Sequence, residues 1–196
     1  MAPQLYLITP ADADPEQLPA TLRAVLDAAE FSALLVARGI MDDAAYARLA
    51  ATVVNIGQGA GCAVLVENDA TLARKLGADG VHVTAGPEAI KSAIAAIKPS
   101  LIVGAGNIHS RHDAMTAGEM DVDYLFFGGT DIGPDPQSVD LAEWWAQTFE
   151  IPAVLSLPDA GPEADAHGAE FLALSTSIWS APNPAEAVRA IAGVSA

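Results

Sequence analysis

Acidic, amide and imidazole side chains follow short apolar segments of this chain, and these residue types suit catalysis. Asn68 and Asp69 come directly after one such segment, and His109 follows another. Asn68 or Asp69 is also a good N-cap for a helix beginning near Ala70. Among the histidines, His109 is the best candidate for a general acid or base. Asp69, His109 or Asp135 acting with a metal ion would suit a lyase or an isomerase.

Two hydroxyl residues, Ser175 and Thr176, follow the last apolar segment and precede a predicted helical turn. The start of a helix favours phosphate because its backbone N–H groups are free and its dipole is positive there. Hydroxyl side chains at this place suit ordinary helix capping equally well. Phosphate binding and capping are therefore both kept as interpretations of Ser175 and Thr176.

Eight short apolar segments must position these side chains. Segments that are apolar throughout, without alternation, are typical of parallel strands buried on both faces. Between them, apolar residues recur at helical spacing, as in residues 18–29, 90–97 and 141–148. This alternation predicts an α/β fold, a compact single-domain (β/α)8 TIM barrel over residues 1–196, with an open doubly wound sheet as the alternative. The apolar segments are residues 5–8, 33–36, 63–66, 81–83, 101–103, 124–127, 153–155 and 171–174.

Prolines and glycines mark the boundaries of the predicted helices. Pro184 and Gly193 lie near the start and the end of the last helix, and Pro162 and Gly168 predict another helix between the seventh and eighth strands. Residues 130–138 are rich in Gly, Pro and Asp and predict a long loop after the sixth strand. In a barrel, that loop lies at the end where such enzymes place their chemistry.

Composition narrows the class of partner. The chain has 9 Lys and Arg against 25 Asp and Glu, a net charge of −16, which disfavours nucleic acid and anionic membranes and favours a small-molecule ligand. No apolar stretch approaches the roughly 18 residues of a membrane span. The single cysteine, Cys62, has no adjoining cation and is interpreted as a core residue. Without a secretory signal, a cytoplasmic location is expected, and homo-oligomerisation is left open.

Segments from most of the chain match one known family in order and spacing: residues 5–9, 66–73, 77–83, 102–110 and 123–129. They resemble the thiamine phosphate synthase and thiazole tautomerase family of small (β/α)8 barrels. The resemblance implies thiamine biosynthesis, in which a pyrimidine methyl diphosphate is joined to a thiazole phosphate. Pyrophosphate is expelled with the help of Mg²⁺, so the leaving group needs cations and a metal held by carboxylates.

The resemblance assigns roles to four residues. Asn68 and Asp69 match an Asn-Asp pair that binds substrate and metal, the aspartate being the metal ligand. Arg38 matches the arginine of a Gln-x-Arg-x-Lys arrangement that binds the substrate, and the other two residues of that arrangement are absent. Glu88 is the nearby substitute for the second acidic metal ligand, although an acidic residue in a first helical turn usually interacts with the dipole.

Other positions depart from the family pattern. Ile40 replaces a lysine, Asp135 lies in the pyrophosphate loop that has lost its lysine, and Gly129 replaces the histidine of the tautomerases. Pro158 and Asp159 stand where the family has Gly-Gly. These changes predict a thiamine phosphate synthase-like protein with weakened diphosphate chemistry. The alternatives are a non-catalytic barrel that binds a less anionic thiamine-related ligand and a different metal-assisted lyase or isomerase, and the fold does not choose among them.

Overall fold

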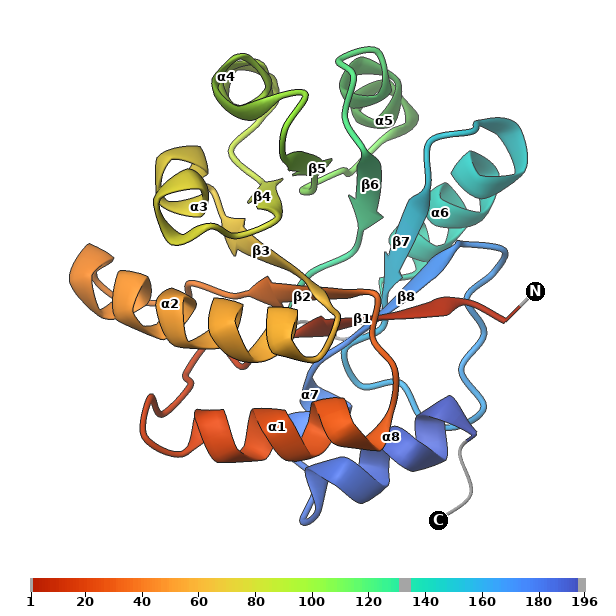
Figure 1. Ribbon diagram of the computed structural model, residues 1–196. Coiled ribbons are helices and arrows are strands. Elements are labelled where there is room, and N and C mark those ends of the chain that lie inside the picture. Colours follow the sequence, from red (N-terminus) through yellow and green to blue (C-terminus); the bar gives the residue numbers. More distant parts are fainter. Residues whose placement is uncertain (1, 131–134, 194–196) are drawn as a thin grey trace.

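Eight parallel strands form a closed barrel in the computed structural model, which describes residues 2–130 and 135–193 (Figure 1). The strands are β1 (Gln4–Ile8), β2 (Ala33–Val36), β3 (Ala63–Glu67), β4 (Gly80–Val83), β5 (Ile102–Ala105), β6 (Tyr124–Phe127), β7 (Ala153–Ser156) and β8 (Phe171–Leu174). β1 closes the barrel: Leu7 pairs with Leu34 of β2 on one side and with Leu174 of β8 on the other. The predicted TIM barrel is confirmed, and the open sheet is excluded.

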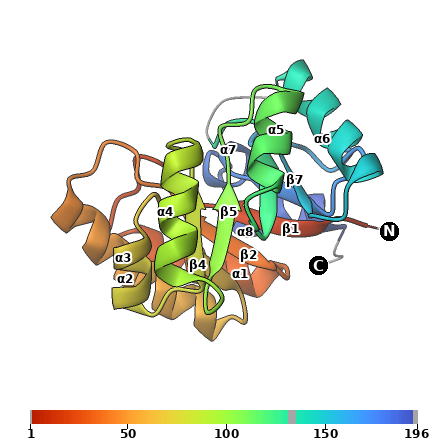
Figure 2. The ribbon, with the colours of Figure 1, turned by 90° about the horizontal axis from the view of Figure 1, so that it is seen from above.

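Helices surround the barrel, as both ribbon views show (Figures 1 and 2). In the described residues they are α1 (Leu18–Ala28), α2 (Asp43–Gly59), α3 (Ala70–Leu76), α4 (Pro87–Ile97), α5 (Arg111–Gly118), α6 (Pro136–Thr148), α7 (Thr176–Trp179) and α8 (Pro184–Ala192). α1 and α8 pack against each other beside the junction of β1 and β8.

The helix predicted from Pro162 and Gly168 is wrong. Residues 157–170 are all described and contain turns but no helix. The apolar side chains that this segment buries are those of Pro158, Ala160, Ala166 and Ala169. A short helix depends on burying a large apolar face, and one proline ring with three methyl groups does not supply one.

Burial on both faces explains why the strands are apolar throughout. In β1, Tyr6 and Ile8 belong to the cluster inside the barrel, whereas Leu7 belongs to the cluster between the barrel and the helices. In β2, Leu35 points inward and Leu34 outward in the same way. Successive side chains of a strand point to opposite faces, so two buried faces leave few polar positions, of which His82 of β4 and Ser156 of β7 are buried examples.

Three further predictions concern single features. Cys62 is buried, and burial raises the pKa of its thiol to about 12, as suits a core residue rather than a nucleophile. None of the helices in the described ranges is long and apolar enough to cross a membrane. Of the predicted loop 130–138, residues 131–134 lie outside the described residues, and α6 begins at Pro136.

Candidate active site

The predicted site residues lie in loops that leave the carboxyl ends of the strands. Arg38 follows β2, Asp69 follows β3, His109 follows β5 and Ser175 follows β8. This is the end of the barrel where (β/α)8 enzymes carry their active sites. Around the barrel, Arg38 and Asp69 lie on the side of β2 to β4, Ser175 lies on the side of β7, β8 and β1, and His109 lies between these sides, after β5.

Arg38 is held in place by contacts from two neighbouring elements. Its backbone N–H donates to Oε2 of Glu67 at 2.9 Å, so the end of β3 fixes the loop after β2. Its guanidinium forms an ion pair with Asp43 and lies over the ring of Tyr46, with Cζ 5.2 Å from the ring centroid. About a third of the side chain is exposed. Arg38 thus presents a positioned cation at the mouth.

Tyr46 of α2 is the centre of this arrangement. Its fully buried hydroxyl donates to the carbonyl of Val36 and accepts from the N–H of Glu67, both at 2.7 Å. Burial raises the pKa of Tyr46 well above its usual range, so the hydroxyl keeps its proton. Sequence reasoning missed both Tyr46 and Glu67. In the sequence, an aromatic residue on the buried face of a helix cannot be distinguished from other core residues. The signal for Glu67 is that an acidic residue ends an otherwise apolar strand.

Asn68 and Asp69 have different partners. Asn68 binds Thr84 with both ends of its amide: Oδ1 accepts from the Thr84 N–H and Nδ2 donates to its hydroxyl, each at 2.7 Å. Asp69 is the N-cap of α3, with Oδ1 accepting from the N–H of Leu72 at 2.7 Å. The expected capping is therefore confirmed. None of the hydrogen bonds among the described residues uses the second carboxylate oxygen of Asp69, which leaves it available for a cation.

Glu88 does not lie with Asp69 in a metal-binding cluster. It is in the first turn of α4, where its side chain is 88% exposed and paired with Lys91 at 2.8 Å. In the part of the chain that the structure describes, no three His, Cys, Asp or Glu side chains are grouped to hold a metal ion. Mg²⁺, however, is usually held by one or two carboxylates together with substrate phosphates. The residues present fit that arrangement through Asp69, not through a protein cage.

His109 and Asp135 are engaged in local contacts. Nε2 of His109 lies 2.6 Å from Oδ1 of Asn107, and the imidazole is exposed. Asp135 is the N-cap of α6, accepting from the N–H of Gln137 and the hydroxyl of Ser138. Gln137 in turn donates to the carbonyl of His109 at 2.8 Å, which joins the loops after β5 and β6.

A buried polar chain lies inside the barrel beneath the mouth. The hydroxyls of Tyr6 and Tyr124 are 3.0 Å apart, and Nδ1 of His82 is 2.9 Å from that of Tyr124. Burial lowers the pKa of His82 to about 4 and raises those of both tyrosines, so all three are neutral at pH 7. Gly104 makes room for this chain, because a Cβ there would collide with the ring of Tyr124.

The backbone donors ahead of α7 already have an acceptor. The N–H groups of Ser175 and Ser177 donate to the carbonyl of Pro158, at 3.3 and 2.8 Å. That carbonyl takes the place that a phosphate oxygen would need at the start of a helix. Pro158 comes from the loop after β7, one of the two loops that form the phosphate site in many barrels. Thr176 has an exposed side chain at the same end.

A groove of about 730 Å³ runs beside the mouth between the loops after β1, β2 and β8. We call it the acidic groove. Gly39 lets two of these loops approach, because a Cβ there would collide with the carbonyl of Ala11. The residues that line the acidic groove include Asp12, Asp14, Gln17, Ile40, Ser175, Thr176 and Trp179.

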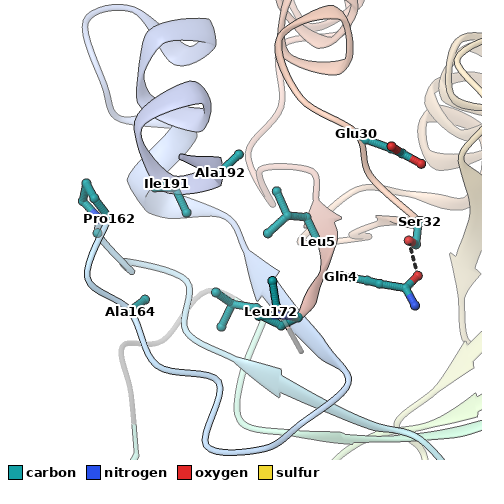
Figure 3. A pocket seen from close by; sticks show the side chains of 12 residues that line it. Gln4, Leu5, Glu30, Ser32, Pro162, Ala164, Leu172, Ile191 and Ala192 are labelled. Atoms are coloured by element: carbon teal, nitrogen blue, oxygen red, sulfur yellow. Dashed lines mark hydrogen bonds between the residues drawn. The ribbon is translucent and has the colours of Figure 1, made fainter. Parts of the chain in front are cut away.

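Another hollow, of about 480 Å³, lies at the opposite end of the barrel (Figure 3). Gln4 and Leu5 at the start of β1 line it together with Leu172 of β8 and Ile191 of α8. Among the residues that line this hollow, the hydroxyl of Ser32 donates a hydrogen bond of 2.5 Å to Oε1 of Gln4. The amino ends of the strands serve stability in (β/α)8 enzymes, so this hollow is not the candidate active site.

Known proteins resemble the chain along almost its whole length. The family model described as thiamine monophosphate synthase matches residues 5–178. A thiamine-phosphate synthase of Hyphomonas neptunium is 37% identical over 202 residues, covering 95% of this chain and 91% of that protein. One of Erythrobacter litoralis is 37% identical over 205 residues, covering 96% and 93%.

Solved structures agree on the fold. Thiamine phosphate pyrophosphorylase from Pyrococcus furiosus superposes with a TM-score of 0.79 at 21% identity, covering 97% of this chain and 94% of that chain. A 3-hexulose-6-phosphate synthase from Salmonella typhimurium has a TM-score of 0.73 at 15% identity, covering 96% and 97%. Identities this low show a shared architecture and leave the chemistry to the site.

Proposed function

Because this chain belongs to the thiamine monophosphate synthase family, we propose that it joins a pyrimidine methyl diphosphate to a thiazole phosphate at the mouth of its barrel. The bond between the methyl carbon and the diphosphate oxygen breaks, and a bond from that carbon to the thiazole nitrogen forms. Pyrophosphate leaves, and the product is thiamine phosphate. The observation that carries this proposal is the position of Arg38 and Asp69 after the carboxyl ends of the adjacent strands β2 and β3.

Arg38 supplies the positive charge that a departing diphosphate requires. A guanidinium matches phosphate oxygens with two parallel donors, and Tyr46 and Glu67 hold it before the substrate arrives. Its partner Asp43 is 93% exposed, and exposed ion pairs contribute little free energy. A diphosphate can therefore displace Asp43 at small cost.

Asp69 supplies the carboxylate for Mg²⁺. The oxygen that does not cap α3 would hold the metal, and Mg²⁺ sites of this kind usually take their other ligands from substrate phosphates and water. When bound, Mg²⁺ neutralises charge that develops on the leaving group. Glu88 lies in the first turn of α4 with its side chain 88% exposed, and the proposal gives it no role in holding the metal.

The test is to incubate the pure protein with both precursors and Mg²⁺ and to measure thiamine phosphate as a fluorescent oxidation product. We expect product, and we expect Arg38→Ala to lower turnover by about 10²-fold because the leaving group loses a charge partner. Arg23→Ala removes an equal charge from the exposed face of α1 and should leave turnover unchanged. Absence of thiamine phosphate at high protein concentration would refute the proposal.

A further inference from the structure

Glu67 is a charged residue on the inner face of the barrel. Successive side chains of a strand point to opposite faces. In β3, Leu65 belongs to the cluster inside the barrel and Val66 to the cluster between the barrel and the helices. Glu67, the last residue of β3, therefore faces the barrel axis at the end where the mouth lies. Within the described residues, it is the single Asp, Glu, Lys or Arg in the eight strands.

Hydrogen bonds hold Glu67 in place but leave one of its oxygens free. Its N–H donates to the hydroxyl of Tyr46, and its Oε2 accepts from the N–H of Arg38 at 2.9 Å. No hydrogen bond in the described ranges uses Oε1, and none of the ion pairs found there includes Glu67. The residue is partly exposed, so a ligand in the mouth can reach it.

The surroundings of this carboxylate are apolar. Ala37, Leu65 and Phe126 belong to the cluster inside the barrel, and all three are buried. Burial and the contact with Tyr124 raise the pKa of Tyr6, and the charge of Glu67 adds to this rise, so the carboxylate lies near the barrel interior. A hydrogen bond to a charged acceptor is strong in such a place. A flat apolar ring with an N–H group at its edge fits these surroundings.

Glu67 lies beside the two residues to which the proposed function assigns the diphosphate and its metal. It contacts the backbone of Arg38 and precedes Asp69 by two residues. A carboxylate repels phosphate, so Glu67 is suited to the ring that a single methylene joins to the diphosphate. The ring nitrogens of a pyrimidine are hydrogen-bond acceptors, as is a carboxylate. The ring must therefore carry an N–H donor of its own, such as an amino group.

We propose that Glu67 determines which pyrimidine the chain accepts. Its free carboxylate oxygen accepts a hydrogen bond from an amino group on the pyrimidine ring and so orients the ring in the mouth. This inference rests on the proposed function, because it concerns one of the two substrates of the joining reaction. A site built to hydrogen-bond a substrate group rejects an analogue that lacks the group, since its own polar atom then has no partner.

The first test measures binding of the ring without its diphosphate. An aminopyrimidine methanol is the probe, and the same alcohol without the amino group is its matched control. Calorimetric titration of the intact protein should show the amino compound binding at least about tenfold tighter, because a hydrogen bond to a charged group is gained. Equal affinity for the two alcohols would overturn the proposal. This comparison needs no variant and no turnover.

Glu67→Gln locates the preference. Glutamine keeps an oxygen for the N–H of Arg38 but presents an amide NH₂ to the ring, so the variant should lose the preference for the amino compound. Glu30→Gln removes an equal charge from an exposed position between α1 and β2, at the other end of the barrel, and should retain the preference. An equal loss in both variants would refute the assignment to Glu67.

Turnover separates ring binding from metal binding. With the diphosphate substrates, Glu67→Gln should raise the KM for the aminopyrimidine by about tenfold or more, and the Mg²⁺ concentration that gives half-maximal turnover should stay the same. A higher Mg²⁺ requirement with an unchanged KM would make Glu67 a metal ligand and overturn the proposal. If the unaltered protein formed no product, the proposed function would fail, whereas the titration of the two alcohols would still decide the role of Glu67.

Discussion

The two sides of the barrel mouth use their polar groups in different ways. On the side of β2 to β4, side chains bind the backbone of the neighbouring loop, as Glu67 binds Arg38 and Asn68 binds Thr84. This leaves a guanidinium and a carboxylate oxygen for a substrate. On the side of β7, β8 and β1, the carbonyl of Pro158 takes the backbone donors. One side thus has the groups that the proposed diphosphate chemistry requires, whereas on the other side the backbone donors already have an acceptor.

The largest effect should come from Asp69→Asn. Asparagine caps a helix as well as aspartate, so the free energy of unfolding should change by less than about 0.5 kcal/mol. Turnover with Mg²⁺ should fall by about 10²-fold, because the metal loses its charged ligand. Assays of product formation and urea unfolding on the same sample separate the two roles.

Asp69→Ala is the matched comparison for that variant. It removes the cap as well, so it should lower the free energy of unfolding by about 1 kcal/mol in addition to the loss of turnover. If Asp69→Asn kept full turnover, Asp69 would be only a cap, and the two sides of the mouth would not differ in the way described.

Asn68→Ala tests the tie between the loops after β3 and β4. The change removes two hydrogen bonds to Thr84 and places alanine at a φ of 54°, so we expect a loss of about 2 kcal/mol in the free energy of unfolding. Asn107→Ala is the comparison at a similar φ of 61°, and its amide makes one hydrogen bond in the described residues, with His109, instead of two. A raised KM without lost stability would instead support the predicted role of Asn68 in substrate binding.

The burial of His82 inside the barrel can be tested by measuring the free energy of unfolding at different pH values. The pKa of His82 is about 4 in the folded chain and near 6.5 when unfolded, so between these values the unfolded chain binds a proton that the folded chain does not. Stability should be full above about pH 6.5 and fall toward pH 4, by at most about 1.4 kcal/mol per pH unit. Urea unfolding across this range measures the slope.

His82→Gln should remove that part of the slope, whereas His112→Gln, on the exposed face of α5, should retain it. Identical slopes in the wild-type protein and His82→Gln would show that the histidine inside the barrel is not kept neutral by burial.

The smallest effect is expected for Glu88→Gln. Its side chain is exposed and paired only at the surface, so turnover should change less than about twofold and stability by less than about 0.5 kcal/mol. A large rise in the Mg²⁺ concentration needed for activity would restore Glu88 as a metal ligand and extend the catalytic side of the mouth to α4.

Sequence reasoning predicted one side of the mouth better than the other. Arg38 and Asp69 follow apolar strands directly, so the barrel rule places them at the same end. Tyr46 was missed because it lies on the buried face of α2, where hydrogen bonding and core packing look alike in sequence. The acidic groove was missed because Asp12, Ile40 and Trp179 share no motif or spacing.

The sequence by itself predicted a barrel of parallel strands buried on both faces, because eight segments that are apolar throughout alternate with helices. The strand pattern left an open doubly wound sheet as the alternative, which the pairing of β1 with β8 excludes. It also predicted that Asn68 or Asp69 would cap the helix beginning near Ala70, and the structure shows that Asp69 does. Only the tertiary structure decided which polar groups remain free. Because β1 pairs with β8, loops that are distant in the sequence lie together and form the groove. The carbonyl of Pro158 accepts hydrogen bonds from the N–H groups of Ser175 and Ser177, which the sequence alone would assign to phosphate. Hydrogen bonds between loops depend on distances in space, which spacing along the chain does not contain.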